Sequence, residues 1–182
     1  MKRDLMIPKV TFRVRTGDEV ETDGGCAIGG QWLNKTTEDF FKGKRVVLFS
    51  LPGAFTPTCS SLQLPGFEDN YEKIKGLGVD EIYCVSVNDS FVMNAWMEDT
   101  GITKVKPLAD GEGVFAQGMG MLVNKPAQGL GMRSWRYSML VIGAEVKKLF
   151  EEPGKNHLSE DDDPLGLSSA ENMLKFMKGK NI

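Results

Sequence analysis

Residues 46–59 read Val-Val-Leu-Phe-Ser-Leu-Pro-Gly-Ala-Phe-Thr-Pro-Thr-Cys, and the order of residue types predicts a strand, a turn and a helix start. The apolar, β-leaning beginning is typical of a buried strand, expected from about Arg45 to Leu51. Pro52-Gly53 then ends the strand and turns the chain. Thr56-Pro57 follows as a helix start, with threonine at the N-cap and proline at the first helical position.

Cys59 falls at the third position of this predicted helix, inside its first turn. The unpaired N–H groups and the positive end of the helix dipole favour a thiolate there. Thr56 is expected either to cap the Cys59 N–H or to turn its hydroxyl toward the sulfur. Most free cysteines are small buried hydrophobes, so the helix position alone is a weak signal. The stretch as a whole predicts that Cys59 is a nucleophile.

Pro52, Thr56 and Cys59 fit the P-x-x-x-T-x-x-C motif of peroxiredoxins. The string from Leu51 to Cys59 resembles the Prx5-like (type II, atypical) peroxiredoxin family. One position departs from that family, because many relatives carry a histidine where this chain has Gln63. The likeness covers nearly the whole chain, through Leu64-Pro-Gly-Phe67, Val79-Asp-Glu-Ile-Tyr-Cys-Val-Ser-Val-Asn-Asp89 and Arg133-Ser-Trp-Arg-Tyr-Ser-Met139.

The resemblance implies a thiol-dependent peroxidase that reduces hydrogen peroxide and organic hydroperoxides. Cys59 would cycle through thiolate, sulfenic acid and a disulfide or mixed disulfide, with no bound cofactor or metal. The implied reductants are glutathione with glutaredoxin, or thioredoxin, and the implied assembly is a homodimer. A thiol-based redox sensor or switch, which oxidises without multiple turnover, is the alternative. A general disulfide oxidoreductase is disfavoured because the chain has no C-x-x-C motif.

Arg136 is the cation expected beside the sulfur, since the resemblance singles out the arginine directly before Tyr-Ser-Met. A guanidinium stays charged and could bond the sulfur and both peroxide oxygens. Arg133 is the competing choice, and on one continuous strand it would face the opposite side. Pro52 is expected to shield the sulfur from water. Backbone N–H groups of Thr58 and Cys59 would stabilise the leaving oxygen, and Gly53 is also expected to line the substrate site.

Cys84 lies in the middle of a predicted strand, where a buried core thiol is the plain interpretation. Type II relatives often carry a second cysteine at this separation, proposed to resolve the sulfenic acid of the first. A disulfide needs Cα atoms within about 7 Å of each other, so the turn around Cys59 would have to unwind. The alternative is attack on the sulfenic acid by glutathione.

Composition excludes several classes of protein. The 182 residues carry a formal net charge of −3, which gives no reason to expect nucleic acid or an anionic membrane as partner. No apolar run approaches the roughly 20 residues of a membrane span, and the N-terminus has no signal-peptide pattern. Three cysteines, an odd number, argue against a secreted disulfide framework and favour a reducing, cytoplasmic compartment.

Other residues receive structural interpretations. Cys26 lies in a glycine-rich loop, and the single histidine, His157, is expected in solvent, which disfavours hydrolase triads. Gly118-Met119-Gly120 is too short a fragment for a dinucleotide site, and the run 161–163 is expected in a solvated acidic loop over 151–165. Four large apolar residues are expected in the core, with a pocket rim or subunit contact as the alternative: Phe55, Phe91, Trp96 and Leu122.

The remaining pattern favours a three-layer α/β arrangement with a mixed sheet, compatible with the thioredoxin-like fold and flanking helices that the resemblance implies. We expect a single domain over 1–182. The alternation over Val10–Val14 favours an edge strand, and the resemblance implies that a short N-terminal hairpin contains it. Pro65 is expected to kink or break the helix that carries Cys59.

Further strands are predicted at 81–87, 104–108, 135–142 and 146–150. Further helices are predicted from Thr36 or Thr37 to before Gly43, from Phe67 to Gly76, at 91–97 and 114–119, and after a Ser168–Glu171 capping box.

Overall fold

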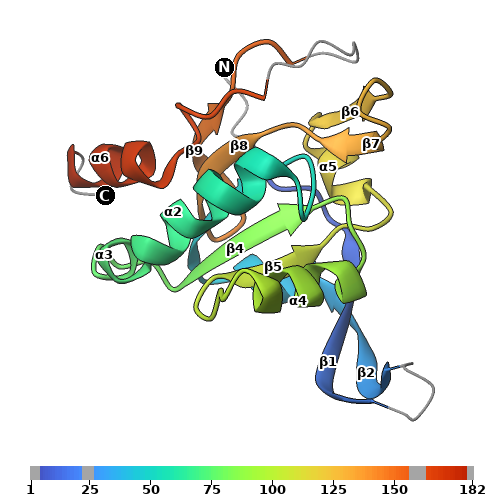
Figure 1. Ribbon diagram of the computed structural model, residues 1–182. Coiled ribbons are helices and arrows are strands. Elements are labelled where there is room, and N and C mark those ends of the chain that lie inside the picture. Colours follow the sequence, from blue (N-terminus) through green and yellow to red (C-terminus); the bar gives the residue numbers. More distant parts are fainter. Residues whose placement is uncertain (1–4, 22–26, 156–162, 180–182) are drawn as a thin grey trace.

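A five-stranded mixed sheet forms the centre of the protein (Figure 1). The computed structural model describes residues 5–21, 27–155 and 163–179. The strand order is β5-β4-β3-β8-β9, in which β3, β4 and β5 are parallel and β8 and β9 are antiparallel to their neighbours. These strands are β3 (Arg45–Ser50), β4 (Glu81–Ser86), β5 (Lys106–Ala109), β8 (Tyr137–Ile142) and β9 (Glu145–Glu151).

Helices cover the sheet because side chains alternate along its buried strands. Val47 and Phe49 of β3 face the helices that contribute Phe67, and the Phe49 and Phe67 rings stack with centroids 4.0 Å apart. Val46 and Leu48 face the opposite side. The helices are α1 (Thr37–Phe41), α2 (Leu64–Asp69), α3 (Tyr71–Lys75), α4 (Ser90–Asp99), α5 (Val114–Gly118) and α6 (Ala170–Gly179). The predicted thioredoxin-like α/β fold is thereby confirmed.

Two hairpins flank this core. The predicted N-terminal hairpin consists of β1 (Thr11–Glu21) and β2 (Ala27–Thr36), and it extends away from the body of the protein (Figure 1). The second hairpin, β6 (Leu122–Lys125) with β7 (Gly131–Ser134), is not anticipated from the sequence. No helix in the described parts of the chain has the length and apolar character needed to cross a lipid bilayer.

The prediction of a strand at 135–142 is wrong for its first two residues. Ser134 still pairs with Leu122 in the small hairpin, whereas Tyr137 pairs with Ser50 in the central sheet. The chain therefore changes sheets across Trp135 and Arg136, which belong to neither strand. An apolar run cannot report this change of partner, because both sheets accept the same residue types.

The helix around Cys59 adapts to Pro65 instead of breaking there. A π-helical turn, η1 (Cys59–Gln63), runs directly into α2, and the Leu64 N–H donates to the Cys59 carbonyl. This wider turn lies just before a proline that lacks an N–H and crowds the carbonyl four residues earlier. The predicted stop at Gly76 is confirmed, since Gly76 caps α3.

Several further predictions need correction. Ser169 rather than Ser168 is the N-cap of α6, because its hydroxyl accepts from the Asn172 N–H at 3.3 Å. Phe55 and Phe91 are 55% and 46% exposed and are therefore not core residues, while Trp96 is fully buried as expected. β5 starts two residues later than predicted and ends at Ala109, and the N-terminal strand continues to Glu21 instead of ending at Val14. The helix predicted from Phe67 to Gly76 is interrupted at Asn70, between α2 and α3. The other strands and helices lie close to their expected positions.

Candidate active site

Cys59 sits at the start of η1, in a helical segment that begins at Pro57 as predicted. The Ser60 N–H donates to the Thr56 carbonyl at 3.0 Å, which closes the first turn around the cysteine. Cys59 has no exposed surface. The sulfur therefore lies at the inner end of the site, and its reactivity depends on the groups packed around it.

Thr56 holds the turn before the helix in a way that the sequence did not reveal. Its hydroxyl donates to the Gly53 carbonyl at 2.8 Å, not to the sulfur, and so its lone pairs remain as acceptors. Gly53 is packed closely, because an added Cβ would lie 3.2 Å from Nη1 of Arg133 and 3.4 Å from Cγ2 of Thr56. Buried Pro52 completes this turn.

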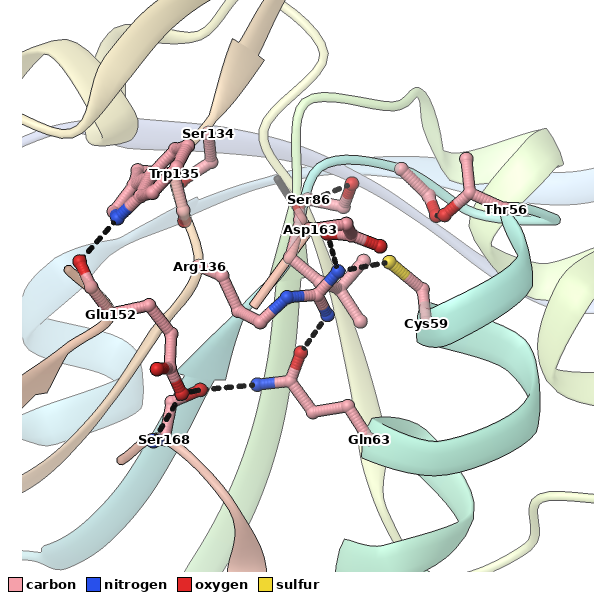
Figure 2. A network of polar contacts seen from close by, with 12 residues as sticks. Thr56, Cys59, Gln63, Ser86, Ser134, Trp135, Arg136, Glu152, Asp163 and Ser168 are labelled. Atoms are coloured by element: carbon pink, nitrogen blue, oxygen red, sulfur yellow. Dashed lines mark hydrogen bonds and ion pairs between the residues drawn. The ribbon is translucent and has the colours of Figure 1, made fainter. Parts of the chain in front are cut away.

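Arg136 brings its guanidinium to the sulfur, as predicted (Figure 2). Its Nη2 donates to Cys59 Sγ at 3.5 Å and also forms an ion pair with Asp163, while Nη1 donates to Gln63 Oε1. If the sulfur is deprotonated, opposite unit charges at this separation attract by roughly 5 kcal/mol at an effective dielectric constant of about 20, before desolvation. The side chain is 1% exposed, so water screens this attraction little.

The charge on Arg136 is stabilised by its neighbours. Burial by itself would lower the pKa of Arg136, but the Cys59 sulfur and the Asp163 carboxylate outweigh it and raise the pKa. The guanidinium therefore stays protonated at neutral pH.

Gln63 is fixed by a chain of buried polar groups (Figure 2). Its Nε2 donates to the Ser168 hydroxyl at 3.4 Å, and that hydroxyl donates to Glu152 Oε1 at 2.8 Å. Burial alone would raise the pKa of Glu152, but hydrogen bonds from Gly166 and Ser168 outweigh it and hold the pKa below its ordinary value. Glu152 is consequently a carboxylate at neutral pH.

Which group donates and which accepts in this series of hydrogen bonds follows from the chemistry of each side chain. A carboxylate only accepts, so the Ser168 hydroxyl must donate to Glu152 and accept from Gln63. The amide nitrogen of Gln63 therefore faces Ser168, and its oxygen faces Arg136. Sequence interpretation placed Ser168 at a helix cap and put Glu152 and Asp163 in a solvated loop. All three belong to the hydrogen-bonded groups around Arg136 and Gln63, and only the folded structure reveals these contacts.

Arg133 does not reach the sulfur. Its Nε donates to the Leu130 carbonyl at 2.9 Å and its Nη1 to the Val87 carbonyl at 3.2 Å. Burial lowers the pKa of Arg133. The preference for Arg136 agrees with the geometry, although the expected reason, opposite faces of one strand, fails because the strand is interrupted between the two arginines.

A pocket of about 450 Å³ opens beside this cluster. Arg136 forms part of its wall and joins it to the sulfur, which is itself covered. The surface exposed to the pocket is mainly apolar, and three of the lining residues are prolines. The lining residues are Pro52, Thr56, Pro57, Thr58, Lys125, Gln128, Leu130, Trp135, Arg136, Asp163 and Pro164.

Cys84 lies in β4, paired with Phe49 of β3, and is fully buried. Burial raises the pKa of the Cys84 thiol well above its ordinary value, and the nearby Cys59 adds to this effect. Both cysteines are free thiols in this structure.

Some sequence interpretations lie outside the described residues, namely those for Cys26, His157 and positions 161 and 162. Within the described ranges, no group of three or more His, Cys, Asp or Glu side chains is arranged to hold a metal ion.

Comparison with known proteins shows the family to which the chain belongs. The Redoxin family model matches residues 26–166. A peroxiredoxin of Rhizobium etli is 49% identical over 182 residues, covering 98% of this chain and 97% of the relative. The crystal structure of a Plasmodium falciparum antioxidant protein (1-Cys peroxiredoxin) is 34% identical with a TM-score of 0.87, covering 98% of this chain and all of the other.

A second structure is that of reduced Prx3 of Vibrio vulnificus in complex with hydrogen peroxide. It is 32% identical with a TM-score of 0.79, over 98% of this chain and 96% of the other. Sequence and structure thus agree over nearly the full length. The chain therefore belongs to the peroxiredoxins of the Redoxin family, which are thiol-dependent peroxidases that take their electrons from a thiol reductant.

Proposed function

We propose that Cys59 is the peroxidatic cysteine of this peroxidase and that Arg136 binds the peroxide. The contact of 3.5 Å between Arg136 Nη2 and Cys59 Sγ carries this assignment. A guanidinium at this place stabilises the thiolate, the attacking form of the sulfur, and presents N–H groups to an incoming oxygen.

In the reaction, the thiolate attacks one oxygen of the peroxide and an S–O bond forms as the O–O bond breaks. Sulfur loses two electrons and becomes a sulfenic acid, and the other oxygen leaves as hydroxide or alkoxide and takes up a proton. Arg136 and the backbone N–H groups of Thr58 and Cys59 stabilise the charge on that oxygen. Thr56 accepts a hydrogen bond from the peroxide, because its own proton already goes to Gly53.

Asp163 accepts a hydrogen bond from Arg136 Nη2, through an N–H that the peroxide would use. Its carboxylate oxygen therefore marks a position for a substrate oxygen next to the sulfur. The Asp163 side chain is 43% exposed, so solvent can receive the carboxylate when substrate displaces it. In this mechanism Pro52, which is buried in the turn before the helix, limits access of water to the sulfur.

Chemical trapping tests this assignment. Reduced protein receives one equivalent of hydrogen peroxide and a reagent that alkylates sulfenic acids, and the modified peptide is identified by mass spectrometry. We expect the adduct on Cys59 alone. An adduct on Cys84 with none on Cys59 would contradict the proposal.

For recycling we propose attack on the Cys59 sulfenic acid by glutathione, followed by glutaredoxin. The burial of Cys84 within β4 supports this route over a Cys59–Cys84 disulfide reduced by thioredoxin, since a disulfide requires the helix start to unwind. Steady-state turnover with the two donor systems in parallel separates the routes, and Cys84→Ser should slow only thioredoxin-driven turnover if Cys84 resolves. Multiple turnover also distinguishes the enzyme from a redox switch.

We propose a homodimer whose interface uses exposed aromatic side chains near the site. Phe55, Trp32 and Phe91 are each more than 40% exposed, and the rings of Trp32 and Phe91 lie 5.5 Å apart. The Ala54 N–H donates to Asn88 at 3.0 Å, which places the Phe55 loop beside the start of α4. Exposed apolar groups of this kind often mark an interface. Analytical ultracentrifugation should give twice the chain mass, and Phe91→Glu should give the monomer.

We propose that the protein works in the cytoplasm. Free thiols at Cys59 and Cys84 fit a reducing compartment. Fractionation of cells that express the natural protein, followed by immunodetection, should find it in the soluble cytoplasmic fraction.

A further inference from the structure

The pocket beside Cys59 contains a second buried cation. Lys125 of β6 lines it together with Arg136, and only 5% of Lys125 is exposed. Its Nζ lies 4.7 Å from the ring centroid of Trp135, which is a further wall residue. A lysine this deeply buried is unusual unless it is paired with an anion.

Lys125 lacks such an anion in the described part of the chain. No carboxylate or other acceptor there lies within bonding distance of its Nζ, whereas Arg136 is paired with Asp163. The Trp135 face offsets part of the desolvation of the ammonium through a cation–π contact. A carboxylate ligand would offset the remaining desolvation cost of the ammonium, because it would replace the lost water with a charged hydrogen bond.

The walls around Lys125 suit a hydrocarbon chain. Pro52, Pro57, Leu130, Trp135 and Pro164 present mainly apolar surface to the pocket. The volume of about 450 Å³ far exceeds what hydrogen peroxide needs. The pocket thus offers one cation next to the reacting sulfur, a second cation, and apolar surface around them.

We propose that Lys125 binds the carboxylate of an organic hydroperoxide whose hydrocarbon chain packs against these apolar walls. This inference rests on the proposed role of Cys59. The hydroperoxide group reaches Arg136, the Cys59 thiolate takes its terminal oxygen, and the O–O bond breaks. The alkoxide that leaves takes a proton from water, and the products are a hydroxy acid and the Cys59 sulfenic acid.

A carboxylate could also come from the reductant, since glutathione carries two. Glutathione must also reach the Cys59 sulfenic acid in the proposed recycling, but its peptide groups match the apolar walls less well than a hydrocarbon chain does. The two sources act in different half-reactions. Oxidation of the thiolate involves only the peroxide, and the reductant reacts afterwards.

The test compares a fatty-acid hydroperoxide with its methyl ester in single-turnover oxidation of reduced protein, without added reductant. Tryptophan fluorescence follows the reaction, and each rate constant is divided by that for hydrogen peroxide. The wild type should prefer the free acid, and Lys125→Met should lower the acid-to-ester ratio about tenfold, the effect of one charged hydrogen bond. Lys125→Arg should retain the preference.

Lys155→Met is the matched control, because Lys155 bonds the Gly120 carbonyl and Glu151 outside the pocket, and it should keep the wild-type ratio. An unchanged ratio in Lys125→Met would overturn the inference, as would an effect found only in the reaction of oxidised protein with glutathione. Failure of the wild type to react with hydrogen peroxide would instead refute the assignment of Cys59.

Discussion

Cys59 and Cys84 lie in two regions that are equally buried but differ in backbone structure and in the groups around the sulfur. Both are fully buried, and both belong to the cluster of apolar residues on one side of the sheet. Cys59 begins a helix and touches a guanidinium, whereas Cys84 is enclosed in the middle of a parallel strand. If Cys59 is the reactive thiol, as proposed, exposure does not distinguish it from Cys84. The neighbouring donors and charges do so.

The largest expected effect separates the two cysteines directly. Cys59→Ser should lower the rate of peroxide consumption by at least about four orders of magnitude, because it removes the nucleophile. Cys84→Ser should retain single-turnover oxidation at close to the wild-type rate. Stopped-flow measurement with hydrogen peroxide checks both, and comparable losses in the two variants would remove the distinction between the two sites.

The second prediction concerns the cation that distinguishes Cys59. Arg136→Gln should lower the rate constant for oxidation about 10²- to 10³-fold, since it removes a donor to both the sulfur and the developing charge. Arg133→Gln is the matched control and should cost much less, because Arg133 bonds only backbone carbonyls.

The third prediction extends the comparison to the groups behind Arg136. Ser168→Ala breaks the link between Gln63 and Glu152 and should lower kcat/KM roughly tenfold, in line with the smaller effects of groups that act through another residue. The pH dependence of the rate should change as well, and Ser168→Thr should restore it.

Ser169→Ala provides the control for this serine. It removes the α6 cap and should cost about 1 kcal/mol of stability, measured by urea unfolding, without changing the pH profile. Equal effects of the two alanine variants on the rate would reduce Ser168 to a structural role.

The smallest effect tests the surroundings of Cys84. Its pKa is raised by burial, so the folded protein keeps this proton at a pH where the unfolded chain loses it. The stabilisation is fully present below the unfolded value of about 8.5 and is lost as pH rises toward the folded value. The loss approaches about 1.4 kcal/mol per pH unit. Above this pH, the free energy of unfolding measured with urea should fall more steeply with pH in the wild type than in Cys84→Ala, by up to that amount per pH unit. The same pH dependence in both proteins would contradict the prediction.

Local patterns predicted much of this arrangement. The apolar run of β3, the turn at Pro52 and the Thr56-Pro57 helix start are short-range features, so the sequence places Cys59 at the start of its helix. The likeness to peroxiredoxins added Arg136, which no local pattern would single out. The Thr56 hydroxyl was assigned to the helix or the sulfur, but it bonds Gly53, because that choice depends on the folded turn.

The features that escaped prediction depend on contacts between distant segments. Glu152, Asp163 and Ser168 follow β9, far along the chain from Gln63, and only folding brings them to Arg136. Their composition resembles a solvated acidic loop, so nothing in the order of residues marks them. The change of sheet at Trp135 also needs knowledge of which strands pair.

By itself the sequence determined the α/β order of elements and the place of Cys59 at a helix start, because backbone propensities and capping act over a few residues. The tertiary structure decided which charged and amide groups meet at the sulfur. It also decided that Lys125 and Arg136 line the same pocket. Such contacts join residues that are far apart in the chain, and the closed, low-dielectric surroundings that strengthen them exist only after folding.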